Sequence, residues 1–219
     1  MPLSPSRFLV LATLVLLPLA GAQAADYVVR SEDPNVLYEP KPELPSLKPF
    51  TRAAVMAKIG SRQPGEVSSA RMVHLDPMNE FVGGDGRLAV WAARQRRNPH
   101  AIVLRKGYLT PADIATVLGP EAMEETAPGI FVARLPILVS RDATFHVDDS
   151  VQQLRLSEDA GSFLVNDGRL FVTDSAVIGW RESTNTPATY RYEKGYRPFI
   201  LSWGGTETYV VNSRFESLG

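Results

Sequence analysis

The chain has no cysteine and few histidines, three in 219 residues. The absence of cysteine excludes disulfides, thiolate nucleophiles, thiolate-bound zinc and iron–sulfur clusters. His74, His100 and His146 do not stand at the spacing of metal ligands, so we expect no metal and no other cofactor. A charge excess of one sign is also missing. The 23 basic residues face 24 acidic ones, which excludes a strong positive field for nucleic acid or an anionic membrane surface.

Apolar residues nevertheless make up 44% of the chain and charged residues 21%, with nine Phe, seven Tyr and three Trp. This composition is typical of a globular protein and excludes a disordered or low-complexity chain. The length suits one domain, or one domain with a small appendage.

An export signal stands at the N-terminus. Arg7 precedes an apolar run from Phe8 to Ala20, and Ala22-Gln23-Ala24 forms a small-x-small site. Residues 1–24 therefore predict a secretory signal peptide that is cleaved after export. A membrane anchor is the alternative, but a run of 13 residues is shorter than the about 20 that span a bilayer. Because the exported chain has no cysteine, we expect a bacterial envelope as its location.

A proline-rich segment follows at residues 25–50. Five prolines between Ser31 and Phe50 fix φ and remove backbone donors, so neither a helix nor a central strand can persist there. We interpret the segment as an extended arm or surface strap. A polyproline ligand is the alternative, but no repeated PxxP register with flanking basic residues supports it.

Residues 51–136 have mixed helix and strand patterns. Thr51 is a capping residue for a short helix that runs through Ile59 and ends at Gly60. The pattern of Glu66–Leu75 predicts a strand, and Asp85 is a candidate N-cap for a second helix over Arg87–Arg97.

The second half of this segment begins with a β-run over Ala101–Leu104 and a turn at Lys106-Gly107. Thr110 as a cap and Pro111 at the first helical position predict a helix that Gly119 ends. We interpret residues 51–136 as a small mixed α/β cap region, with this helix placed to cover the open end of the following β-structure.

From residue 137 to residue 219 the chain consists of short β-runs separated by Asn, Asp and Gly. The runs begin at intervals of 9, 9, 7 and 7 residues, near Phe145, Leu154, Phe163, Leu170 and Val177. The step from Leu154 to Val177 is 23 residues, a period that solenoids use. Phe171–Ser175 also matches Tyr209–Ser213 at an offset of 38, which one solenoid turn plus an inserted loop around Thr184–Arg197 can explain.

We therefore predict a mainly β fold, the start of a right-handed parallel β-helix preceded by the mixed cap region. A jelly roll or Greek-key sandwich is the alternative, although a period of about 22 residues with polar corners fits a solenoid better. The segment Tyr209–Gly219 lies in the middle of such a turn, so we expect the natural chain to continue beyond Gly219. A swapped or bound chain that covers the last edge is the competing explanation.

Four long strings in this sequence occur in one order: Glu80–Asp85, Ala127–Pro136, Gly161–Gly168 and Arg197–Tyr209. They resemble the N-terminal part of the periplasmic poly(β-D-mannuronate) C5-epimerases of alginate-producing bacteria. The resemblance implies a right-handed β-helix and a periplasmic location. It also implies alginate or polymannuronate as the polymer bound, with other periplasmic alginate export proteins as further partners.

Members of that family convert mannuronate to guluronate within the polymer by removing and returning the C5 proton. This needs a base, a cation or donors that stabilise the substrate carboxylate, and an acid on the opposite face. The resemblance implies that a histidine, an arginine and an Asp-Pro-His-Asp motif supply these parts. The motif is absent here, because Asn35 follows Asp33-Pro34 and Met78 follows Asp76-Pro77. No catalytic residue is transferred, and we expect this chain to be inactive alone.

His146, followed by Asp148 and Asp149, is the catalytic candidate within the chain itself, and a solvent-facing or rim histidine is the alternative. Four arginines near β-runs could line a groove for a polyanion or be ordinary surface charges: Arg169, Arg181, Arg191 and Arg197. Trp203–Thr206 indicates either a sugar-stacking surface or a tryptophan packed in the core.

The leading functional prediction is part of an isomerase, a mannuronan C5-epimerase of alginate biosynthesis. A non-catalytic periplasmic scaffold or polysaccharide-guiding component is the alternative. A polyuronate lyase on the same fold is the third reading, because elimination also begins with abstraction of the C5 proton.

Overall fold

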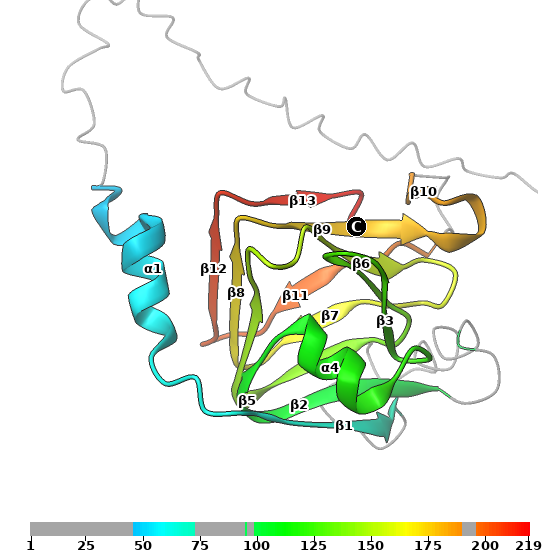
Figure 1. Cartoon of the computed structure of the whole chain (residues 1–219), viewed down its shortest axis with the longest axis horizontal. Coiled ribbons are helices and arrows are strands. Elements are labelled where there is room, and N and C mark those ends of the chain that lie inside the picture. The colour runs from blue at the N-terminus through cyan, green and yellow to red at the C-terminus, as the bar shows by residue number, and fades with distance from the viewer. Residues whose placement is uncertain (1–45, 73–94, 96–98, 190–195) are drawn as a thin grey trace, which may run out of the picture. The chain divides into compact units, whose positions relative to one another are not determined.

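The computed structural model describes residues 46–72, 95, 99–189 and 196–219 (Figure 1). The predicted signal peptide, most of the arm, the helix over 87–97 except Gln95, and His74 lie outside these residues. The described residues are mostly in strands, which form two sheets, as the predicted mainly β class requires. None of the described helices is long and apolar enough to cross a membrane.

The described helices are few and short, and the strands are numerous. The helices are η1 (Lys48–Phe50), α1 (Arg52–Ile59), α4 (Pro111–Leu118) and η4 (Glu182–Thr184). The strands are β1 (Glu66–Arg71), β2 (His100–Leu109), β3 (Met123–Ala127), β4 (Ile130–Ala133), β5 (Ile137–Val147), β6 (Gln153–Ser157), β7 (Leu164–Asn166), β8 (Arg169–Thr173), β9 (Ala176–Arg181), β10 (Thr186–Pro187), β11 (Ile200–Ser202), β12 (Glu207–Val211) and β13 (Arg214–Glu216).

Most of these strands pair in parallel along three ladders. One ladder runs through β4, β6, β9 and β13. The second joins the first half of β5 to β7 and β11, and the third joins the second half of β5 to β8 and β12. The chain thus adds one strand, or half of β5, to each ladder in turn before it returns to the first ladder. We call one such passage a layer: β4 and β5 form the first layer, β6 to β8 the second, and β9, β11 and β12 the third.

The strand register pairs positions at the two separations noted in the sequence. Gln153 on β6 pairs with Ala176 on β9, 23 positions later. Phe171 on β8 pairs with Tyr209 on β12, 38 positions later. The longer step arises between β9 and β11, where β10 folds back antiparallel on β9. Parallel pairing between successive layers differs from the antiparallel pairing of a jelly roll or Greek-key sandwich, so these alternatives do not describe the fold.

Side chains alternate between the inside and the outside of the stack, because successive residues of a strand point to opposite faces. Phe145 and Leu170, which pair across β5 and β8, belong to the main buried core. His146 and Phe171, the next pair in this register, point to the outer side. There Phe171 packs with Val55 of α1, which Figure 1 shows beside β8 and β12.

The predicted helix from Pro111 is confirmed as α4, and its ends follow the predicted signals. The Thr110 hydroxyl accepts a hydrogen bond from the backbone N–H of Asp113, whose carboxylate accepts one from the N–H of Thr110 in return. Gly119 ends the helix at a φ of 77°. The helix buries Ile114 in the main core and contacts β1 and β3, so it covers part of the core next to the first layer.

Two predicted boundaries are wrong. The turn at Lys106-Gly107 does not form, because β2 continues to Leu109 in parallel pairing with β5. The residues that resemble a turn instead accompany a shift in the strand register between Leu104 and Lys106. The first β-run begins at Ile137, well before Phe145, since β5 bends around a corner and takes part in two ladders.

Candidate functional site

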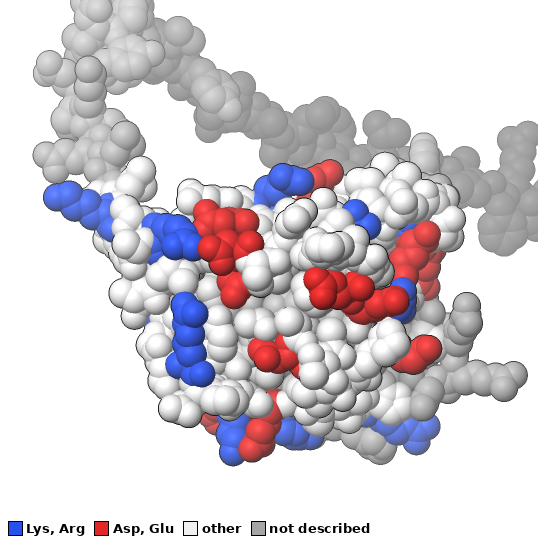
Figure 2. All heavy atoms as spheres, viewed as in Figure 1, with Lys and Arg blue, Asp and Glu red and all other residues white. Residues whose placement is uncertain are grey.

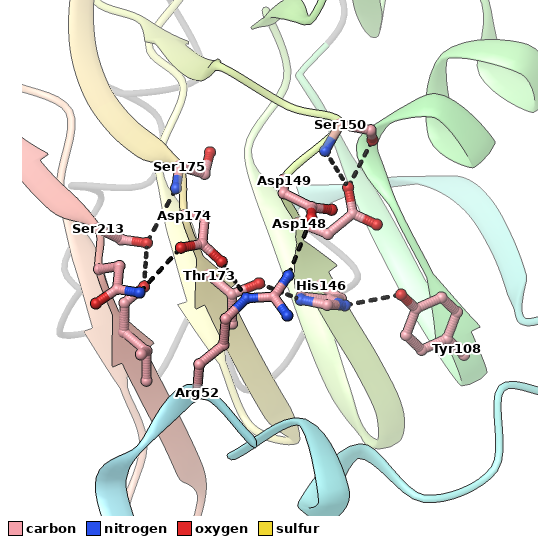
Figure 3. A network of polar contacts seen from close by, with 12 residues as sticks. Arg52, Tyr108, His146, Asp148, Asp149, Ser150, Thr173, Asp174, Ser175 and Ser213 are labelled. Atoms are coloured by element: carbon pink, nitrogen blue, oxygen red, sulfur yellow. Dashed lines mark hydrogen bonds and ion pairs between the residues drawn. The ribbon is translucent and has the colours of Figure 1, made fainter. Parts of the chain in front are cut away.

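His146 lies on the outer side of β5 and is completely buried, with 0% of its surface exposed. Both ring nitrogens have hydrogen-bond partners (Figure 3). Nδ1 lies 2.7 Å from the Tyr108 hydroxyl on β2, and Nε2 lies 2.8 Å from the Thr173 hydroxyl on β8. The solvent-facing or rim position that the sequence left open is therefore wrong.

Aromatic rings complete the surroundings of His146. The Tyr108 ring meets the imidazole edge to face at a centroid distance of 5.8 Å, and the Phe171 ring does so at 6.2 Å. Tyr209, in the next layer, stacks on Phe171 at 5.2 Å. The outer side of this ladder is thus a column of rings, and the apolar side chains of α1 cover part of it. A base for a polymeric substrate must reach a proton on that substrate, and a histidine enclosed in this way does not.

At the corner that follows β5, β8 and β12, polar side chains of successive layers contact one another. We call Asp149, Asp174 and Asn212, together with Arg52 of α1, the polar column. The Arg52 guanidinium on α1 binds the Asp174 carboxylate and lies 2.9 Å from the Asp149 carboxylate (Figure 3). In the next layer, the Asn212 amide donates to Asp174 at 3.0 Å. The hydrogen bond from Arg52 holds the pKa of Asp174 below its ordinary value, with Asn212 acting in the same direction. Arg52 thus links α1 to two layers of the stack.

Sequence reasoning missed this column, although its signal was present. Asp174 and Asn212 occupy the same place in the two strings that match at an offset of 38. Both adopt a left-handed backbone conformation, with φ values of 53° and 50°. Asp and Asn tolerate that conformation better than most residues, which explains why they recur at this corner.

The buried position of His146 predicts a pH-dependent stability. Burial lowers the pKa of its imidazole; Asp148 and Asp149 raise this pKa, and Arg62 and Arg52 lower it further. The unfolded chain therefore binds a proton at this residue more readily than the folded one. Stability is complete above the ordinary pKa of about 6.5 and falls as the pH drops below it.

We expect His146 to account for a loss of up to about 1.4 kcal/mol in the free energy of unfolding between pH 7.5 and pH 5.5. Urea unfolding at both pH values measures this loss. The control is His146→Gln, which does not titrate but keeps an amide that can hydrogen-bond. Equal losses in the two proteins would mean that His146 contributes nothing to the pH dependence.

The three described arginines of the predicted groove do not gather at one place. Arg181 is buried and pairs with Glu158 at 2.6 Å. Arg197 donates to the Leu218 carbonyl at 3.3 Å. Arg169 pairs with Glu207 at 3.3 Å and also donates to carbonyls at the end of α1. Arg191 lies outside the described residues.

The remaining candidates do not form a reaction centre. His100 begins β2 and is half-buried, away from the ladder that holds His146. Trp203 is half-buried at the corner after β11, and its backbone N–H donates to the Asn166 carbonyl at 2.8 Å. Among the described residues, no group of three or more His, Asp or Glu side chains is placed to hold a metal ion. Figure 2 shows Lys and Arg interspersed with Asp and Glu on the face that it presents.

Comparison with solved structures finds similar chains of one class of protein. The chain superposes on the crystal structure of the periplasmic alginate epimerase AlgG with a TM-score of 0.75 and 38% sequence identity. The match covers 80% of this chain and 41% of the solved one. No protein-family model matches the chain.

Curated proteins with similar sequences carry a single name. The mannuronan C5-epimerase of Pseudomonas aeruginosa is 47% identical over 197 residues, which are 90% of this chain and 36% of that protein. Mannuronan C5-epimerase AlgG of Azotobacter vinelandii is 45% identical over 193 residues, 88% of this chain and 37% of the relative. The chain thus spans a little over a third of the length of the curated relatives it matches. The resemblance seen in the sequence is confirmed: over nine-tenths of its length this chain is a homologue of the mannuronan C5-epimerases.

Proposed function

We propose that this chain is part of a periplasmic mannuronan C5-epimerase, and that its described residues form the capped start of the right-handed parallel β-helix that carries the polymer. The observation that carries the proposal is the 47% identity over 90% of the chain. The parallel ladders of β4 to β13 support it, because a substrate polymer needs an extended surface and stacked layers provide one.

The proposed organisation follows the sequence. Residues 1–24 direct export to the periplasm and are removed, and residues 25–50 form a proline-rich arm. Residues 51–136 form the cap region, and the β-helix proper extends over 137–219 and beyond Gly219. The parallel pairing of β2 with β5 joins the cap region to the stack without a break. Alginate or polymannuronate is the polymer bound, and other export proteins of the periplasm are the expected partners.

The division of labour within the whole epimerase follows from the chemistry. Epimerisation at C5 needs an accessible base, an acid on the opposite face of the sugar, and a cation or hydrogen-bond donors for the substrate carboxylate. Both ring nitrogens of His146 are hydrogen-bonded to hydroxyl groups of the protein, and Arg52 forms ion pairs with two carboxylates. In the proposed enzyme the described residues therefore support the protein surface that binds the polymer, and the proton transfers occur elsewhere.

A two-arm conversion assay tests this proposal. The reading frame is sequenced downstream of the codon for Gly219, and its full product and the mature form of the present chain, residues 25–219, are each incubated with polymannuronate. We expect the anomeric and H5 proton NMR signals of guluronate to appear with the full product and not with the shorter chain.

Three results would contradict the proposal. Guluronate formed by the shorter chain would place the reaction within this chain. Unsaturated products that absorb in the near ultraviolet would indicate a lyase. A stop codon directly after Gly219, together with no conversion, would favour the non-catalytic scaffold instead.

A further inference from the structure

In each layer the chain turns a corner between the second ladder (β5, β7 and β11) and the third ladder (β5, β8 and β12), and this corner differs in length from layer to layer. In the first layer four residues separate Val139 from Thr144, and in the third layer four separate Ser202 from Glu207. In the second layer only two residues, Asp167 and Gly168, fill the same corner. Because strand pairing holds the three corners in register, the short middle corner lies back between its longer neighbours.

A hollow of about 370 Å³ opens at this place, and we call it the corner notch. Its volume lies at the lower end of the range of about 300–1,000 Å³ that small-molecule sites occupy. Its lining includes Arg141, Asp167, Arg169, Gly204, Thr206 and Glu207. Trp203 is not among the lining residues, so the sugar-stacking role considered for that tryptophan is not the one that the notch offers.

The two arginines of the notch are held differently. Arg169 is fixed at its floor by Glu207, at 3.3 Å, and by the carbonyls of Lys58 and Ile59. Arg141 has 83% of its side chain exposed and lies 3.9 Å from Asp167. This distance is at the outer limit of an ion pair, so the guanidinium of Arg141 can turn to an incoming anion at little cost.

The groups of the notch match the chemistry of a uronate unit. A guanidinium binds a carboxylate through two parallel hydrogen bonds, and Arg141 offers that fork. The carboxylates of Asp167 and Glu207 and the hydroxyl of Thr206 accept hydrogen bonds from sugar hydroxyls. A Cβ added at Gly204 would meet no atom within 4 Å, so one wall of the notch is open backbone that a pyranose ring can approach.

We propose that the corner notch is a binding subsite for a uronate unit of the polymer, with Arg141 pairing the sugar carboxylate. The assignment rests on the proposed function, because that function supplies a polyuronate as the ligand. The subsite holds the polymer near the capped end of the stack and takes no part in proton transfer.

Isothermal titration of the mature chain with a mannuronate hexasaccharide tests the subsite. Arg141→Ala removes the exposed guanidinium, and Gly204→Leu fills the notch without a left-handed backbone at that position. We expect each substitution to weaken binding by about tenfold or more. Arg141→Ala loses a hydrogen bond to a charged group, and Gly204→Leu places a side chain where the sugar ring would lie. The matched control is Arg214→Ala, an exposed arginine on β13 in another ladder, and it is expected to leave the affinity unchanged. Mannohexaose, which lacks the carboxylates, is expected to bind at least tenfold more weakly than the uronate.

The outcomes separate the subsite from the proposed function. Binding of the hexasaccharide that is equal in the unsubstituted chain, Arg141→Ala and Gly204→Leu would overturn the subsite and leave the epimerase assignment intact. If Arg214→Ala weakened binding to the same degree, the effect of Arg141→Ala would reflect only the loss of one positive charge. That result would also overturn the subsite. No binding by the unsubstituted chain would overturn it too, whereas the conversion assay decides the epimerase assignment independently.

Discussion

Gly168→Ala is expected to lower the free energy of unfolding by about 3 kcal/mol, the upper part of the range for overpacking a close-packed interior. A Cβ at this position would lie 2.3 Å from the Ser140 carbonyl oxygen and 2.6 Å from that of Ala143. Both atoms belong to the backbone of the first-layer corner, so no side-chain rotation can relieve the clash. The corners of the first two layers must therefore move apart, which also disturbs the pairing of Asn166 with Val139.

Urea unfolding followed by far-ultraviolet circular dichroism measures the effect of Gly168→Ala. The control is Gly204→Ala in the third-layer corner, where the added Cβ has open space and little change is expected. A destabilisation of Gly168→Ala no larger than that of Gly204→Ala would contradict the close stacking of the corners. Because the middle corner forms the back of the notch, Gly168→Ala is also expected to weaken binding of the mannuronate hexasaccharide.

Phe145→Ala is expected to cost about 3–5 kcal/mol, the range for truncating a buried aromatic side chain. Phe145 is completely buried and points into the main core from the second half of β5. It pairs in register with Leu109 of β2 on one side and Leu170 of β8 on the other. The strands on both sides hold the backbone in place, so the cavity left by the ring cannot collapse fully.

Two further variants calibrate the effect of Phe145→Ala in the same urea experiment. Phe145→Leu keeps most of the apolar volume and is expected to cost clearly less. Phe50→Ala truncates the same residue type where 58% of it is exposed, and we expect a change within about 0.5 kcal/mol. Equal losses in the free energy of unfolding for Phe145→Ala and Phe50→Ala would mean that the Phe145 side chain does not hold the core together.

Local signals in the sequence predicted the described helices well. Thr51 caps α1 by accepting from the N–H of Ala54, and Gly60 ends the helix at a φ of 68°. The reciprocal pair of Thr110 and Asp113 begins α4. These residues act within one or two turns of the chain, so their effect does not depend on the rest of the fold.

Strand boundaries were predicted less well because non-local pairing decides them. Gly107 has a φ of 73° and resembles a turn residue, but β5 holds the strand together across the irregularity. The passage from Val139 to Thr144 resembles a break between strands, yet β5 stays paired on both sides of it. Neither outcome can be read from a window of ten residues, since the partner strand lies about 35 positions away.

The sequence by itself determined the homology to the mannuronan C5-epimerases, the mainly β composition, the helix ends, and the 38-residue offset between Phe171 and Tyr209. These features depend on residue identity and on order along the chain. Tertiary structure alone decided that His146 is enclosed by Tyr108 and Thr173, and that Arg52 joins α1 to Asp174. It also decided that a short corner between two long ones leaves the notch beside Arg141. The physical reason is the same in each case: stacking of layers brings together residues far apart in the sequence, and side-chain burial follows from that stacking.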